Sequence, residues 1–108
     1  MALPRANRLS LRAHRARLTQ TGRSVYGRFF TVIFSHQDTA SVPRFAILVS
    51  KKTAPLASDR NRIKRTVSSV IQSLPPLPVG DYLLIPKRQV LQTEFTDLQK
   101  DLSALFQR

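Results

Sequence analysis

The sequence contains no cysteine and no tryptophan among its 108 residues. Without cysteine the chain can form no disulfide scaffold and no thiol nucleophile, and every cysteine-ligated zinc site is excluded. The lack of disulfides is typical of proteins from a reducing compartment, so we expect a cytoplasmic protein.

Acidic side chains are scarce. Six Asp and Glu stand against 18 Lys and Arg, which gives a formal net charge of +12 and a pI near 11.7. The whole excess lies in residues 1–65, because residues 66–108 carry four cations and four acids. Such asymmetry indicates a face that binds a polyanion, and the 13 arginines suit bidentate contacts with phosphate. The carboxylates of the basic part, Asp38 and Asp59, are too few for a protein-built two-metal site.

Long hydrophobic runs are missing as well. The dense apolar stretch Phe29–Phe34 has six residues, whereas a membrane-spanning helix needs about 18–20. The first 18 residues are rich in arginine and lack acids, which superficially resembles a mitochondrial presequence. Pro4 and the connection to the next strand favour a mature N-terminus instead. We therefore expect no membrane partner.

The apolar fraction of 42% and the chain length predict one folded domain over residues 1–108. Ser10 predicts the N-cap of a short helix over residues 11–20, with Gly22 as its usual C′ residue. A strand is expected from Tyr26 to Ser35. Because both of its faces are largely apolar, this strand should be central and covered on both sides.

The rest of the chain predicts four more elements. A second strand is expected at Arg44–Ser50, and Ser58 should cap a helix of about 15 residues with one buried apolar face. A short strand at Tyr82–Ile85 and a last helix capped by Thr93 complete the chain. The order helix, strand, strand, helix, strand, helix predicts an α+β fold, a small two-layer α/β sandwich on one sheet.

Residues 60–65 read Arg-Asn-Arg-Ile-Lys-Arg and fall in the first turns of the expected middle helix. A helix N-terminus carries partial positive charge and favours acids, so four cations there break the usual rule. Local rules tend to be broken at functional sites, and a phosphate docked there would neutralise the cations and bond the free N–H groups. The alternative is an ordinary solvated basic face.

The stretch from Arg44 to Arg65 resembles the signature of the bacterial ribonuclease P protein subunit. An arginine leads a strand that ends in Val-Ser-Lys-Lys at residues 49–52, and a short loop then precedes the Arg-Asn-Arg-Ile-Lys-Arg run. The similarity extends to Asn-Arg-Leu at residues 7–9, Gly-Arg-Ser at residues 22–24 and Asp-Tyr at residues 81–82, and it covers nearly the whole chain.

The resemblance implies a fold like that of the second domain of a small-subunit ribosomal protein, with a left-handed β-α-β crossover. It implies a catalytic RNA partner that, with Mg²⁺, removes the 5′ leader from precursor tRNA. The protein would be the non-catalytic subunit of this endonuclease, binding the RNA and the leader without a cofactor of its own. The RNA-contacting residues so implied are Arg60, Asn61, Arg62, Lys64, Arg65, Lys51, Lys52, Arg8 and Arg12.

The family holds the leader in a cleft between the first helix and the sheet, commonly with three aromatic residues. Here those positions are Arg15, Thr19 and Ile33, so leader binding should depend more on charge. Phe29, expected on the strand face of Ile33, and the nearby Tyr26 are both candidates to replace the missing aromatics, and core packing is an equal alternative for Phe29. Ser68 and Ser69 also depart from the pattern, because the family usually has an Arg-Glu pair there.

No catalytic residue is expected on the protein itself. His14 and His36 lie in different segments, and each is better explained as a surface or RNA-facing group than as a base. An autonomous nuclease is therefore disfavoured. The main alternative is a structural RNA-binding protein, such as a small ribosomal protein, which composition alone does not separate from the leading hypothesis.

Overall fold

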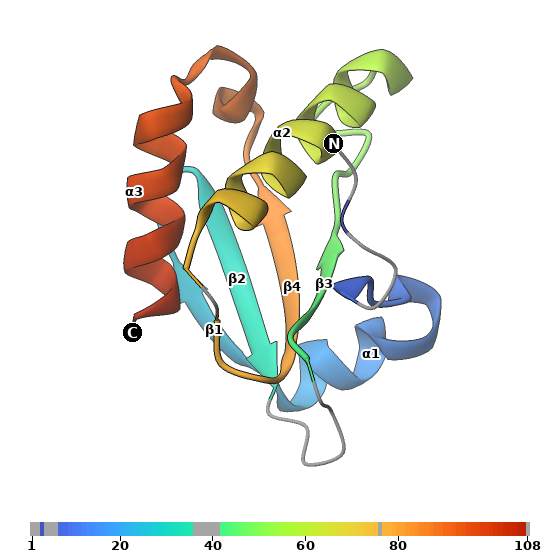
Figure 1. Ribbon diagram of the computed structural model, residues 1–108. Helices are drawn as coiled ribbons and strands as arrows, with labels where there is room; N and C mark the ends of the chain where they lie inside the picture. Colours follow the sequence, from blue (N-terminus) through green and yellow to red (C-terminus); the bar gives the residue numbers. More distant parts are fainter. Residues whose placement is uncertain (1–2, 4–6, 36–41, 76, 108) are drawn as a thin grey trace.

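The computed structural model describes residues 3, 7–35, 42–75 and 77–107. Three α-helices, four strands and a 3₁₀ turn follow one another along this part of the chain (Figure 1). Their bounds are α1 Leu11–Thr21, β1 Arg23–Tyr26, β2 Phe30–Ser35, β3 Arg44–Ile47, α2 Ala57–Ser73, β4 Asp81–Pro86, η2 Arg88–Gln92 and α3 Phe95–Phe106.

The four strands form one sheet in the order β1-β2-β4-β3. β2 pairs antiparallel with β1 and with β4, so it is central as predicted, while β3 runs parallel to β4. In Figure 1, β3 and β4 point upward, α2 crosses in front of the sheet, and the chain moves from β3 leftward to β4. The β3-α2-β4 crossover is therefore left-handed, as the family resemblance implies.

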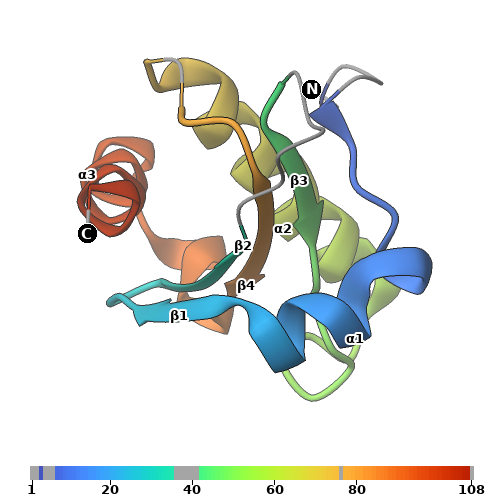
Figure 2. The same cartoon turned by 90° about the horizontal axis from the view of Figure 1, so that it is seen from below.

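Helices cover both faces of the sheet, and α1 lies on the opposite side from α2 and α3 (Figure 2). The larger core lies under α2 and α3, where Phe30, Leu84, Ile63 and Leu98 are fully buried. A smaller cluster under α1 includes Leu18 together with Ile33 and Leu83 of the sheet. The predicted α+β sandwich is confirmed.

The strand predicted at residues 26–35 is wrong in one respect, because it is a hairpin of β1 and β2. The backbone turns at Gly27, whose N–H donates to the Phe30 carbonyl at 2.8 Å. Asp101 of α3 then accepts hydrogen bonds from the N–H groups of Arg28 and Phe29, at 3.0 and 2.9 Å. A carboxylate 72 or 73 positions away thus fixes a turn that local periodicity does not reveal.

The helix caps are confirmed in one case out of three. Ser10 accepts a hydrogen bond from the Ala13 N–H and caps α1. Ser58 lies inside the first turn of α2, whose N-cap is Leu56, and Thr93 precedes Glu94, the N-cap of α3. Neither helix has a side-chain cap bond. Thr93 instead donates to the Gln89 carbonyl of η2, four residues earlier.

Gly22 follows α1 as expected, but not for the usual C′ reason. Its φ of −75° is accessible to any residue. A Cβ there would lie 2.4 Å from the Leu18 carbonyl oxygen and 2.5 Å from a methyl of Ile33, so the glycine allows α1 to approach β2.

The ends of two strands also differ from the prediction. The strand predicted at Arg44–Ser50 is β3 and ends at Ile47, and β4 is one residue longer at each end than predicted.

Candidate nucleic-acid interface

The first half of α2 presents a solvent-exposed basic surface. Asn61, Arg62, Lys64 and Arg65 are all exposed, whereas Ile63 between them is completely buried in the main core. The amphipathic pattern of the helix therefore holds its cations outward, where they can contact phosphate oxygens.

Arg60 differs from the other cations of its segment. Its side chain is half-buried and turns back, and Nη1 donates to the carbonyl oxygens of Ala54 and Pro55, both at 2.9 Å. These carbonyls belong to the loop that leads into α2, so Arg60 fastens this loop to the helix. The two bonds also explain how a cation is tolerated at the N-terminal end of the helix. The sequence pattern alone did not indicate this structural role.

The turn before α2 adds exposed cations to the same end of the helix. Lys51 and Lys52 lie in a turn closed by Ser50, whose hydroxyl accepts the Thr53 N–H at 3.2 Å. Arg88 of η2 reaches this turn from the far part of the chain and donates to the Thr53 carbonyl at 3.3 Å. Arg88 falls in the charge-neutral segment 66–108, where charge distribution gives no reason to expect an RNA contact. In the sequence, the only indication that Arg88 adds to the basic surface is the Lys-Arg pair directly after β4.

The N-terminal cations lie along the outer edge of the sheet and on α1. Arg8 forms an isolated parallel bridge with Phe45 of β3, and its Nε donates to the Leu3 carbonyl at 2.8 Å. Its side chain is nevertheless exposed, as is that of Arg12. His36 lies outside the residues that the structure describes.

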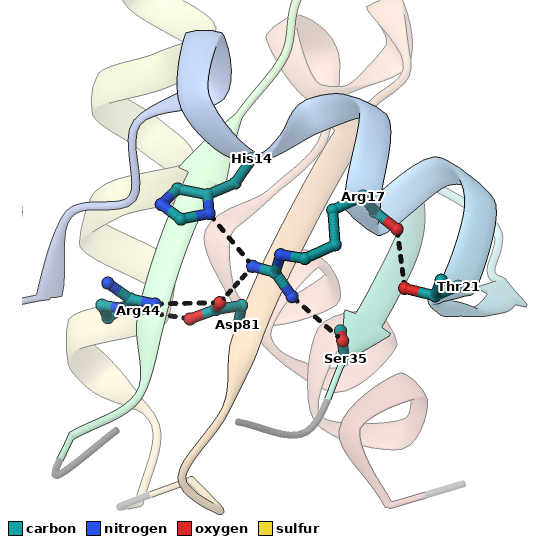
Figure 3. A network of polar contacts seen from close by, with 6 residues as sticks. All are labelled: His14, Arg17, Thr21, Ser35, Arg44 and Asp81. Atoms are coloured by element: carbon teal, nitrogen blue, oxygen red, sulfur yellow. Dashed lines mark hydrogen bonds and ion pairs between the residues drawn. The ribbon is translucent and has the colours of Figure 1, made fainter. Parts of the chain in front are cut away.

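Not every basic residue near this surface is available to a ligand. Asp81, which is fully buried, accepts hydrogen bonds from Arg17 of α1 at 2.5 Å and from Arg44 of β3 at 2.8 and 3.0 Å (Figure 3). The sheet register places Ser35 and Arg44 directly beside Asp81. Arg17 also donates to Ser35 and contacts Nδ1 of His14 at 3.2 Å. These contacts fasten α1 to the sheet.

The charge balance around Asp81 determines its protonation. Burial by itself would raise the pKa of this carboxyl group, but hydrogen bonds from Arg44 and Arg17 and their positive charges outweigh it and lower the pKa below the usual value. The carboxylate is therefore ionised at neutral pH and holds two arginines in a structural role. His14 belongs to this network through Arg17.

Four of the five residues expected in a cleft between α1 and the sheet lie on α1 or on the sheet face that α1 covers. Arg15 and Thr19 are exposed one turn apart on α1, and the Thr19 hydroxyl donates to the Arg15 carbonyl at 2.6 Å. Ile33 lies on the sheet face that α1 covers and is 8% exposed. Tyr26 pairs with Thr31, so strand alternation places it on this same face, where it is 70% exposed.

Phe29 is the exception, and its placement on the face of Ile33 is wrong. It lies in the turn before β2 rather than in the strand, and it packs against the core under α2 and α3, on the other side of the sheet. The guanidinium of Arg28 covers its ring at 5.3 Å. The hairpin turn, which Asp101 fixes, breaks the alternation on which the expectation depended.

Two other features bear on the function classes. No helix within the described part of the chain has the length and apolar character needed to cross a membrane. Among the same residues, no group of three or more His, Asp or Glu side chains is arranged to hold a metal ion.

Comparisons with known proteins all match one family. Residues 3–108 match the family model described as Ribonuclease P. The chain is 35% identical over 86 residues to the ribonuclease P protein component of Carboxydothermus hydrogenoformans, covering 77% of this chain and 73% of that protein. It is 31% identical over 109 residues to the same component of Salmonella arizonae, covering 100% and 91%.

Solved structures give the same result for the fold. The RNase P protein from Thermotoga maritima superposes with a TM-score of 0.80 at 25% identity, covering 94% of this chain and 96% of that one. A mutant Staphylococcus aureus RNase P protein superposes with a TM-score of 0.80 at 26% identity, covering 94% and 86%. These similarities favour the leading sequence hypothesis over a small ribosomal protein.

Proposed function

Because the chain belongs to the ribonuclease P protein family, we propose that it binds the family's RNA subunit through the exposed face of α2 and assists that RNA in removing the 5′ leader of precursor tRNA. RNA binding and tRNA processing follow from the family, and the partner is accordingly an RNA subunit. The precursor tRNA contact, the division of labour between protein and RNA, and a cytoplasmic location belong to the proposal.

The observation that carries the proposal is the group of exposed cations at one end of the molecule. It comprises Arg62, Lys64 and Arg65 of α2, Lys51 and Lys52 of the preceding turn, and Arg88, which bonds to that turn. Asp59 is the one acid in the first turn of α2. Cations concentrated in this way release counterions when they meet phosphates, which gives strong and salt-dependent RNA binding.

A second part of the proposal concerns the leader. We place it across the α1 side of the sheet, between the exposed Arg15 and Thr19 on α1 and the exposed ring of Tyr26 on β1. Arg15 supplies a charge and a planar group, and Tyr26 supplies an aromatic face on which a base can stack. This arrangement compensates for the aromatic residues that α1 lacks.

We infer that the protein supplies no catalytic side chain and that Mg²⁺ acts through the RNA. The donor set supports this, because the fully buried carboxylate of Asp81 is already bonded to two guanidinium groups and Asp101 is bonded to two backbone N–H groups. His14 is likewise in contact with Arg17. A bound Mg²⁺ would stabilise charge on reacting phosphate oxygens, and the described residues of this chain do not form a site for it.

The test is reconstitution with the cognate RNA. At a Mg²⁺ concentration too low for the RNA alone, added protein should restore removal of the 5′ leader from precursor tRNA, while the protein alone should cleave nothing. Absence of stimulation would contradict the proposal. Stimulation that does not depend on the leader would favour a purely structural RNA-binding role.

A further inference from the structure

A groove of about 290 Å³ lies between residues 8–11, β3 and the middle of α2. Its apolar lining includes Leu9 and Leu11 from one side and Ala46 from the sheet, and Arg8, Lys64 and Ser68 also line it. Arg8 and Leu9 lie along the outer edge of β3, where the Leu9 N–H donates to the Phe45 carbonyl at 2.8 Å. This groove lies at the β3 edge of the sheet, opposite the β1 edge that carries Tyr26.

The lining of the groove combines an apolar interior with positive charge at its mouth. Leu9 and Ala46 are buried, whereas Arg8 and Lys64 are exposed. No carboxylate is among the lining residues that the structure describes. An apolar slot flanked by two cations is complementary to a nucleotide, whose base has apolar faces and whose phosphate is negative.

Ser68 opens the space in the groove. It lies one turn after Lys64 on α2, lines the groove and is only 7% exposed. A hydroxyl in this position can bond to a base edge, and the small side chain leaves room for it. Pockets for drug-sized ligands range from roughly 300 to 1,000 Å³, so this volume suits a group as small as one base.

From these observations we propose that the groove receives one unpaired base of the RNA subunit, with Arg8 and Lys64 on its phosphate or ring face and Ser68 on its edge. This inference deepens the proposed function and rests on it. The occupant is assigned to the RNA subunit rather than to the leader because Lys64 belongs both to the groove and to the basic face of α2.

The experiment fills the groove with a larger side chain and measures which bases of the RNA subunit the protein protects. Ser68→Leu places an apolar side chain in the slot, and Ser69→Leu is the matched control, since the next helical position is rotated by roughly 100° around the axis. Both proteins are bound to the cognate RNA subunit, and the complex is probed with dimethyl sulfate for base edges and with hydroxyl radicals for the backbone.

With the unaltered protein and with Ser69→Leu, at least one unpaired base of the RNA subunit should be protected from dimethyl sulfate. With Ser68→Leu that base should become reactive while the backbone protections elsewhere persist, and binding should weaken roughly tenfold, the order expected for one lost base contact. If Ser68→Leu lowers the melting midpoint, Ser68→Met replaces it with the same expectations, because methionine adapts to irregular space.

Several results would overturn the inference. These are identical base protection with Ser68→Leu, a protected base that lies in the precursor leader, or a groove variant that changes self-association instead of RNA protection. Failure of the unaltered protein to bind or stimulate the RNA is a different result, because it would contradict the proposed function itself. If the unaltered protein stimulates the RNA normally and Ser68→Leu gives the same base protection and affinity, only the groove inference would be contradicted.

Discussion

Asp81 has a fully buried carboxylate that neutralises two arginines from different elements. We expect Asp81→Asn to lower the free energy of unfolding by about 3 kcal/mol, because Arg17 and Arg44 lose the negative charge that they share. Urea unfolding measures this loss. Asp97→Asn, at an exposed site in α3, is the control and should cost less than about 1 kcal/mol. Equal losses in the two variants would show that Asp81 has no special structural role.

The lowered pKa of Asp81 also predicts how this stabilisation depends on pH. A carboxyl group whose pKa is lower in the folded state stabilises the fold above its unfolded pKa, near 4, and this contribution is lost as pH falls through the folded value. The difference in unfolding free energy between the unaltered protein and Asp81→Asn should therefore be full at pH 7 and shrink below about pH 4. A difference that stays constant down to about pH 2 would contradict the charge-based explanation.

Tyr26 and Phe29 are close in sequence but lie on opposite faces of the sheet, so they should behave differently. Tyr26→Ala should weaken binding of precursor tRNA by roughly five- to tenfold relative to mature tRNA, because one base–aromatic stack is lost. Tyr26→Phe should retain most of the preference for precursor over mature tRNA, because it keeps the aromatic ring.

Phe29→Ala is the contrasting variant, because the ring packs against the main core. It should lower the melting midpoint without changing the ratio of precursor to mature tRNA affinity. Titration of the holoenzyme with both tRNAs gives the ratio for all three variants. A selective loss of precursor binding in Phe29→Ala would show instead that Phe29 contacts the leader.

At the scale of elements, α2 combines two kinds of arginine. Arg62→Ala with Arg65→Ala should leave the unfolding free energy within about 0.5 kcal/mol, since both side chains are exposed. RNA binding should weaken, and the slope of log K against log salt should become shallower by about 1.4–1.8, corresponding to two phosphate contacts. A slope equal to that of the unaltered protein would remove these residues from the interface.

Arg60→Ala provides the comparison within the same helix. Arg60 bonds to the Ala54 and Pro55 carbonyls, so its loss should cost about 1 kcal/mol of stability and loosen the loop before α2. Its effect on RNA binding should therefore be accompanied by a lower melting midpoint, unlike that of the Arg62 and Arg65 pair. Thermal melting and RNA titration of the same preparations separate the two effects.

Sequence periodicity predicted the elements better than it predicted their ends. The existence of α2 and α3 follows from their apolar spacing, and α2 buries Ile63, Val67 and Val70 as that spacing indicates. The existence of α1, which buries Leu18, follows instead from its Ser10 cap. The β1–β2 turn was missed because its stabilising partner is Asp101 on α3, which is distant in the chain. Helix starts at Ala57 and Phe95 were missed because neither depends on a capping side chain.

For the whole molecule, the formal charge of +12 overstates the charge that is available to a ligand. Arg17 and Arg44 bond to Asp81, and Arg60 bonds to carbonyls, so these cations of the basic segment have structural partners. The remaining exposed cations of α2, the Lys51–Lys52 turn and Arg88 form the proposed RNA face.

This division of the cations predicts the salt dependence of RNA binding. With about five phosphates contacted, log K for the RNA subunit should fall with log salt at a slope of roughly −3.5 to −4.5. Filter binding between about 50 and 200 mM salt measures the slope. A slope of about −10 would mean that nearly all cations, including those bonded to Asp81, contact RNA, and would contradict the division between structural and RNA-binding cations.

The sequence by itself determined the class of the protein, because charge distribution, apolar periodicity and the Val-Ser-Lys-Lys and Arg-Asn-Arg runs are local properties of the chain. The tertiary structure alone decided which cations are available. It paired Arg17 and Arg44 with a carboxylate that lies 64 and 37 positions away, and it brought Arg88 to the turn at Thr53. It also moved Phe29 away from the face of Tyr26 and formed the groove at Ser68. Such pairings depend on contacts between segments that are distant in the chain, so no local sequence pattern predicts them.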